Sequence, residues 1–138
     1  MNTEYIYYHL LVAASGSDDS TEAYVPIPAD SSPYEVVSAV FVPNVAVTAH
    51  GSNHWTVALK ATDGEAGTPG SSMGGFSTDS GSGGASLAAG DKVAITVSAA
   101  AAQAVAGGAI QIDVNEGGTA PANLDGCLCI GIRKLPPA

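Results

Sequence analysis

Positively charged side chains are scarce in this sequence of 138 residues. It has four lysines and arginines against thirteen aspartates and glutamates, which gives a formal net charge of −9 and a pI near 4.3. A protein that binds nucleic acid neutralises phosphates with clustered Lys and Arg side chains. Lys60, Lys92, Arg133 and Lys134 are too few and too scattered for that task. We therefore expect no nucleic-acid partner.

Long apolar runs are also missing. No apolar stretch approaches the roughly 18 residues that mark a membrane-spanning helix. Residues 1–14 have Glu4 before their apolar part, contain no Lys or Arg, and are interrupted by tyrosines and a histidine. A signal peptide has a basic start and an unbroken apolar centre instead. We expect no membrane partner and no targeting segment, and we predict that the chain is made and assembled in a reducing cytosol.

Cysteine is rare, with only Cys127 and Cys129 present. Residues two apart on a β-strand point to the same face roughly 7 Å from each other, which is too far for an easy mutual disulfide. A structural zinc site would need His or Asp ligands, because there is no second cysteine pair. We interpret both cysteines as small buried hydrophobic residues, with metal binding or redox chemistry as the alternatives.

The chain is instead rich in alternating apolar and polar residues, the period of a half-buried strand. The first such segment has two predicted faces. One face carries Tyr5, Tyr7, His9 and Leu11, and the other carries Ile6, Tyr8, Leu10 and Val12. Further strands are predicted at residues 22–27, 34–42, 53–60, 91–98, 108–115 and 127–135. Segment 34–42 is apolar on both faces, which is typical of a central strand.

Two stretches lack this alternation. Residues 62–90 are rich in glycine and serine, and we predict a long loop there with at most one short strand at residues 74–78. Residues 99–108 are rich in alanine, and we predict a connection with one helical turn.

The number and spacing of the strands predict an all-β protein. We expect a single jelly-roll or Greek-key β-sandwich of roughly seven to nine short strands. Residues 1–33 would form an N-terminal strand and a proline-containing arm or hairpin of the same domain. Residues 34–138 would form the sandwich.

No catalytic constellation follows from the spacing of polar residues. His50 and His54 flank a Gly-Ser-Asn turn without a third ligand in register, so we interpret them, and His9, as packed or surface residues. A Gly-x-Ser-x-Gly elbow is absent, and residues 61–91 hold no lysine to complete a phosphate-binding glycine loop. A cupin-type metal enzyme would need all three histidines to converge. We expect no enzymatic activity and no cofactor.

Several acids lie in glycine- and serine-rich segments, as calcium ligands often do. They lack the spacing of an EF-hand loop, so we interpret them as solvated loop acids, with an adventitious divalent cation as the alternative. These residues are Asp18, Asp19, Asp63, Glu65 and Asp79.

Three segments together resemble a known group of proteins. They are FVPNVAVTAHGSNHWTVALK, LAAGDKVAITVS and GGAIQIDVNEGGTAP. A β-branched strand ends in a Pro-Asn turn at Phe41–Asn44, an aromatic-centred strand follows at Asn53–Lys60, and a leucine followed by Gly-Asp leads into the strand of Leu87–Val97. A strand anchored by Gly-Gly and a glycine-rich turn then occupy Gly107–Thr119. This pattern resembles the small β-sandwich structural proteins of tailed bacteriophages, namely capsid decoration (cement) proteins and head-fibre domains. Leucine followed by Gly-Asp also occurs in jelly rolls similar to tumour necrosis factor.

The resemblance implies a homotrimer that binds the major capsid protein on the outer surface of a phage capsid. Such a protein stabilises the shell by non-covalent contacts, because binding only the assembled state favours it by mass action. The acidic balance suits an outer surface, away from packaged DNA. Candidate interface residues are Tyr5, Tyr7, Tyr8, Tyr24, Pro26, Pro28 and Tyr34.

The alternative function is a receptor- or carbohydrate-binding head domain of a viral fibre. In that case the tyrosines within residues 5–24 would form a sugar-stacking platform with Trp55. His50 and Asp63 would be among the loop residues that contact the sugar.

Overall fold

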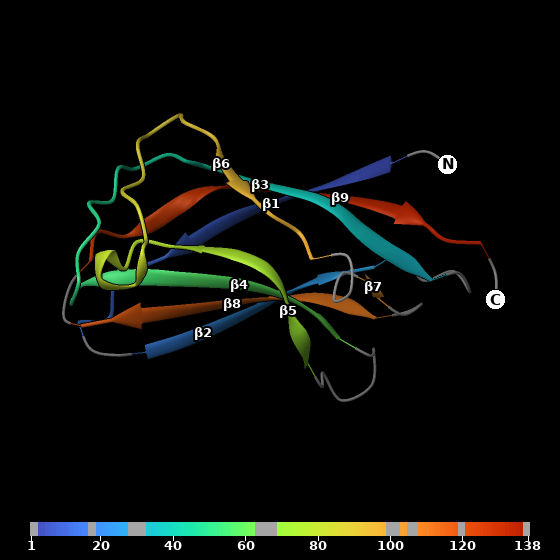
Figure 1. The fold of residues 1–138 in the computed structure, drawn as a ribbon, viewed down its shortest axis with the longest axis horizontal. Helices are drawn as coiled ribbons and strands as arrows, with labels where there is room; N and C mark the ends of the chain where they lie inside the picture. Colours follow the sequence, from blue (N-terminus) through green and yellow to red (C-terminus); the bar gives the residue numbers. More distant parts are fainter. Residues whose placement is uncertain are drawn as a thin grey trace.

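Two antiparallel β-sheets lie face to face in the computed structural model, as the upper and lower layers in Figure 1. The structure describes residues 3–16, 19–27, 33–62, 69–98, 103–104, 108–118 and 121–136. Sheet A has the strand order β1-β9-β3-β6, with β7 also paired to β3, and sheet B has the order β2-β8-β4-β5. The strands are β1 (Thr3–Val12), β2 (Asp19–Pro26), β3 (Tyr34–Pro43), β4 (His54–Thr62), β5 (Pro69–Ser77), β6 (Val93–Ile95), β7 (Gln103–Ala104), β8 (Ala109–Gly117) and β9 (Leu124–Lys134).

The pairing of these strands is nested. β1 pairs with β9, β2 with β8, β3 with β6 and β4 with β5, each pair antiparallel. The chain is therefore one long hairpin, closed at β4 and β5, that is wound so that successive pairs alternate between the two sheets. This connectivity is the jelly-roll form of the β-sandwich, which confirms the predicted fold class.

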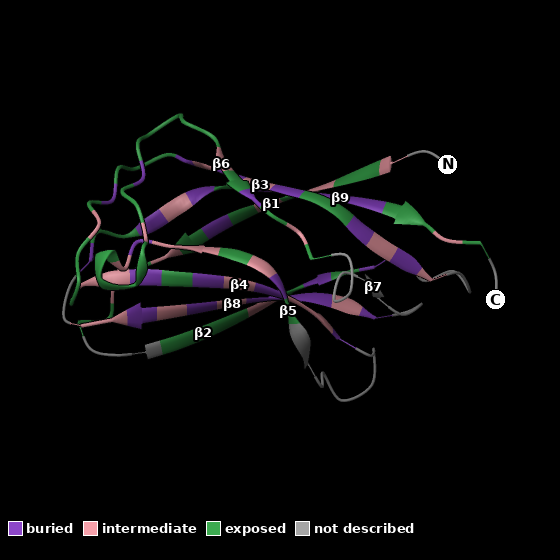
Figure 2. Ribbon diagram, viewed as in Figure 1, coloured by how far each residue is buried: buried purple, intermediate pink, exposed green. Residues whose placement is uncertain are grey.

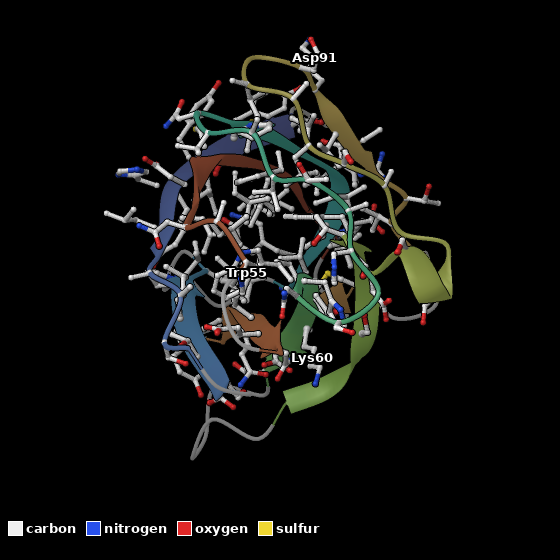
Figure 3. The ribbon with its side chains drawn as sticks, turned by 90° about the vertical axis from the view of Figure 1, so that its left-hand side faces the viewer. Trp55, Lys60 and Asp91 are labelled. Carbon is white, nitrogen blue, oxygen red and sulfur yellow. The ribbon has the colours of Figure 1, made fainter. Side chains whose placement is uncertain are left out.

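The core lies between the sheets because one face of each strand is apolar. Trp55, Val57 and Leu59 of β4 are each at most 1% exposed, as their alternation predicts. Figure 3 shows Trp55 between the two layers, and Figure 2 shows the alternation of buried and exposed residues along the strands. Phe41 of sheet A stacks on Phe76 of sheet B with ring centroids 4.9 Å apart, which joins the layers directly.

The N-terminal segments are edge strands rather than a free arm or a hairpin. All ten residues of β1 pair in continuous register with β9, and all eight residues of β2 pair with β8. Their inward side chains, among them Leu10 and Val25, belong to the same core cluster as the rest of the chain. Apolar alternation in both segments therefore builds the sandwich itself.

The prediction of one long loop over residues 62–90 is wrong in part. Pro69–Ser77 form β5, which includes most of the short strand predicted at 74–78 and begins earlier. Glycine is required in this strand, because a Cβ on Gly75 would collide with the backbone carbonyl oxygen of Val57. The glycines that suggested a loop thus permit a close approach of β5 to β4.

After β5, a short turn and a single β-bridge organise the described residues 78–90. A 3₁₀ turn, η1, spans Ser80–Ser82, and Leu87 forms an isolated bridge with Val47. Within the alanine-rich stretch 99–108, residues Gln103–Ala104 form β7 against Tyr34 and Glu35, so a helical turn at these two residues is excluded. Most of that stretch lies outside the described residues.

Candidate functional site

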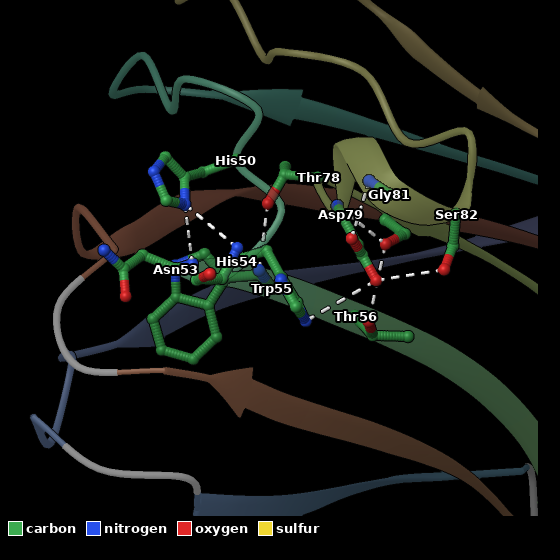
Figure 4. Close-up of polar contacts among 11 residues, drawn as sticks. His50, Asn53, His54, Trp55, Thr56, Thr78, Asp79, Gly81 and Ser82 are labelled. Carbon is green, nitrogen blue, oxygen red and sulfur yellow. Dashed lines mark hydrogen bonds and ion pairs between the residues drawn. The ribbon is translucent and has the colours of Figure 1, made fainter.

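The loop end of β4 gathers two of the three histidines around a turn (Figure 4). The Nδ1 atom of His50 accepts hydrogen bonds from the backbone N–H groups of Ser52 and Asn53, at 3.0 and 2.9 Å. Thr78, which is fully buried, accepts a hydrogen bond from the backbone N–H of Trp55 through its hydroxyl oxygen, at 2.9 Å. The two hydrogen bonds that His50 Nδ1 accepts from backbone N–H groups thus fix its ring in the turn.

Asp79 is the acid of this cluster, and its oxygens are occupied by the 3₁₀ turn. One oxygen accepts from the backbone N–H of Gly81 at 2.9 Å and the other from the hydroxyl of Ser82 at 3.1 Å. His54 Nε2 lies 3.8 Å from the same carboxylate. Ser82 therefore bonds to the acid and not to the imidazole, so these three residues do not form a Ser-His-Asp catalytic arrangement.

The three histidines do not converge. His9 lies on β1 in sheet A, where its Nε2 is 2.7 Å from the Asp125 carboxylate. Among the described residues, no group of three or more His, Cys, Asp or Glu side chains could hold a metal ion. Of the predicted loop acids, the side chains of Asp18, Asp19, Asp63 and Glu65 lie outside the described part of the chain.

The outward face of sheet A is the second candidate site. On β1, Tyr5, Tyr7 and Leu11 point outward and are 58%, 71% and 62% exposed. The register places Tyr7 directly opposite Cys129 on β9, and Cys129 opposite Val40 on β3. Outward positions of these three strands carry the side chains of Tyr5, Tyr7, His9, Leu11, Cys127, Cys129, Val40 and Val42, which we call the sheet A face. Large exposed apolar side chains gathered on one face mark an association surface.

The cysteines are not buried, which corrects their sequence interpretation. Cys127 is exposed, Cys129 is half-buried, and both thiols are free. Alternation along β9 places Leu128, Ile130 and Ile132 in the core, so the two cysteines must point outward into the sheet A face. Cys129 raises the pKa of the Tyr7 phenol, first because a thiolate opposes a second negative charge and then through their hydrogen bond.

The charged groups at the ends of the sheet A face are paired. At one end the Arg133 guanidinium donates to the Glu35 carboxylate, with Nε 2.8 Å from the oxygen. At the other end Asp125 accepts from His9 and from the side-chain amide of Asn44, the latter at 3.2 Å. These hydrogen bonds, that of His9 first, lower the pKa of the Asp125 carboxyl. The face therefore combines an apolar centre with the Arg133–Glu35 ion pair at one end and the His9–Asp125 hydrogen bond at the other.

The outward face of sheet B has the opposite character. Glu22 of β2 lies directly opposite Asp113 of β8, which places two carboxylates side by side. Lys60 of β4 points outward, as Figure 3 shows, and its ammonium is 3.2 Å from Asp113. Polar Thr56 and Asn115 continue the surface across the sheet. This face is polar and acidic, so the two sides of the sandwich differ sharply.

The predicted interface residues fall in different environments. Tyr5 and Tyr7 lie on the sheet A face, whereas Tyr24 and Pro26 are exposed on β2 in sheet B. Tyr8 points inward and packs against the core, and Tyr34 is only 3% exposed, so neither offers a free surface. Pro28 lies outside the described residues. Among the described residues of this set, Tyr5 and Tyr7 thus lie together on β1, and Tyr24 and Pro26 lie together on β2.

Sequence reasoning missed Glu116, a buried acid at the end of β8. It is 5% exposed, and its two carboxylate oxygens accept from the backbone N–H groups of Ser15 and Gly16 at 2.6 and 3.1 Å. Its inward parity with Ile112 and Val114 was the available signal. The role of this residue is to hold the turn after β1.

No protein-family model matches the chain, and no curated protein matches its sequence significantly. Among the described residues, no helix is long and apolar enough to cross a membrane.

Proposed function

We propose that this protein is a virion structural protein of the decoration, or cement, type. It would assemble with copies of itself in the host cytoplasm and bind the major capsid protein on the outer surface of a phage capsid. The observation that carries the assembly of copies in this proposal is the exposed apolar sheet A face, on which Tyr5, Tyr7 and Leu11 are each more than half exposed. Such a face is suited to non-covalent contact.

The phage capsid enters the proposal through the sequence resemblance, and the jelly-roll fold is compatible with it. A net charge of −9 on the whole chain suits a surface that faces solvent and not packaged nucleic acid. Contacts made only with an assembled shell stabilise that shell by mass action. Function then requires no reacting side chain.

The alternative, a carbohydrate-binding fibre head, loses part of its support. Trp55 is 1% exposed and its indole N–H donates to the Ala122 carbonyl at 2.7 Å, so its ring cannot stack on a sugar. Tyr24 remains exposed, but it lies on the opposite sheet from Tyr5 and Tyr7. The predicted platform is therefore not assembled on one surface.

The test is binding of the purified protein to empty capsids that lack it, taken from the phage whose genome encodes the chain. We expect co-sedimentation at a fixed ratio to the capsid subunit and a higher disruption temperature of the decorated shell. A protein that stays in the supernatant at all ratios contradicts the proposal. Protein that sediments with sugar-coated beads but does not bind capsids would favour the fibre-head alternative.

A further inference from the structure

The two outward faces of the sandwich make different demands on a partner. On sheet B, Lys60 pairs with Asp113, but the neighbouring Glu22 carboxylate is exposed, so a second copy of this acidic chain would meet a like charge there. On the sheet A face, the Arg133–Glu35 ion pair lies at one end, the His9–Asp125 hydrogen bond lies at the other, and apolar and aromatic side chains lie between them. The sheet A face therefore offers two identical chains an approach that is centred on apolar and aromatic side chains.

The size of the sheet A face is sufficient for such a contact. Strands β1, β3 and β9 have ten or eleven residues each. With a strand spacing of about 4.8 Å and a rise of about 3.3 Å per residue, they cover roughly 500 Å². Two copies would then bury roughly 1,000 Å² together, which reaches the lower bound of specific interfaces.

The chemistry of the face also fits a protein surface better than a charged ligand. Tyrosine is enriched in the centres of protein interfaces, because its ring buries much apolar area at little cost in conformational entropy. Tyr7 lies between Tyr5 and Leu11 on the edge strand β1 and opposite Cys129 of β9, so it is in the middle of the row of large exposed side chains. Burial of this patch would remove three large exposed hydrophobic side chains from water.

We propose that the sheet A face is the surface through which copies of this chain bind one another, with Tyr7 and Leu11 as its anchors. The inference deepens the proposed function, because it rests on self-association and assigns it to a surface. Cys127 and Cys129 lie on the sheet A face, so contact between two copies would cover them. The reactivity of their thiols therefore reports directly on this contact.

The experiment combines solution mass with thiol reactivity on the full chain. Sedimentation velocity over a range of concentrations gives the mass against 13.6 kDa for one chain. A small aromatic disulfide reagent gives the rate at which both cysteines react. We compare the native chain with Tyr7→Lys and Leu11→Lys, and use Tyr24→Lys, an exposed tyrosine on the edge strand of sheet B, as the matched control.

We expect the native chain and Tyr24→Lys to assemble and their thiols to react more slowly as the protein concentration rises. Each sheet A variant should weaken association by about 30-fold or more, the loss typical of an interface hot spot, with thiols that react quickly at every concentration. Circular dichroism like that of the native chain shows that a variant is folded, as expected for substitutions at the exposed positions Tyr7, Leu11 and Tyr24.

Three results would overturn the inference: a native chain that stays at 13.6 kDa, an assembled chain whose thiols react as fast as those of the dissociated chain, or an equal loss of assembly in Tyr24→Lys. The capsid assay is read separately. A monomer that decorates capsids would overturn the self-association surface alone, and an assembled protein that ignores capsids would overturn the proposed function alone.

Discussion

At the scale of single residues, a buried carboxylate holds the two described residues Ser15 and Gly16 after β1. Glu116 satisfies two backbone N–H groups of the turn after β1, which would otherwise lack these partners. We expect Glu116→Gln to lower the free energy of unfolding by about 1–3 kcal/mol, because a charged acceptor is lost and an amide N–H₂ faces a donor. Urea denaturation measures this.

The control for that substitution is Glu22→Gln on the outward face of sheet B. Glu22 is exposed and accepts one hydrogen bond, from the Tyr24 hydroxyl at 3.0 Å. Its replacement should change the free energy of unfolding by no more than about 0.5 kcal/mol. Equal effects of the two substitutions would contradict the role assigned to Glu116.

Asp125 makes stability depend on pH at acid values. Its pKa is lowered in the folded chain, so the carboxylate contributes stability that is present above the unfolded pKa of about 3.9. That contribution is lost as the pH falls through the lower folded pKa. We expect the native chain to lose more stability than Asp125→Asn between about pH 6 and pH 3, measured by urea unfolding. If the free energy of unfolding of the two chains falls in parallel over this pH range, then Asp125 does not make stability depend on pH.

Residue positions were predictable where alternation alone decides them. The inward parity of Trp55, Leu59 and Ile130 follows from the period of two and is confirmed by their burial. For the cysteines, the pattern predicts only that both share one side of β9. Free cysteine is usually buried, and that general tendency gave the wrong side, because three isoleucines and leucines already fill the inner face.

At the scale of elements, close strand contacts depend on glycine. A Cβ on Gly126 of β9 would lie 2.5 Å from the Phe41 ring and 2.5 Å from the Val42 carbonyl oxygen. We expect Gly126→Ala to destabilise the fold by about 1–3 kcal/mol, because the ring must leave its stack on Phe76. Thermal unfolding measures the loss.

Gly51→Ala is the matched substitution in a loop. A Cβ there would lie 3.7 Å from the Ser80 hydroxyl, which is ordinary contact. The melting temperature should therefore stay close to that of the native chain. If Gly126→Ala melts at the same temperature as Gly51→Ala, then the packing of Phe41 against β9 does not limit how closely β3 and β9 approach.

At the scale of elements, the sequence predicted the strands that contain β-branched residues. It did not predict the full strand where glycines replace the alternating side chains. β3 is central in sheet A, as its apolar faces predict. β5 escaped the pattern because Gly74 and Gly75 replace the alternating side chains in a strand that must approach β4 and the Thr96 backbone closely. β7 is only two residues long, too short for any period to appear.

At the scale of the whole molecule, the sandwich has one apolar and one acidic side. A half-buried strand pattern predicts which residues point outward, but not which outward faces are apolar together, since that depends on the strand order. The jelly-roll order brings the tyrosines of β1 beside the cysteines of β9, although the partners Tyr7 and Cys129 lie 122 positions apart in the sequence. The candidate site was therefore only partly accessible from the sequence.

The central claim is that the chain acts by contact through copies of itself. Its most direct test is the molar mass of the native chain by sedimentation equilibrium as concentration increases. We expect a reversible rise to a closed multiple of 13.6 kDa, three times that value if the trimer implied by the sequence resemblance is correct. A mass that remains at 13.6 kDa at every concentration would contradict it.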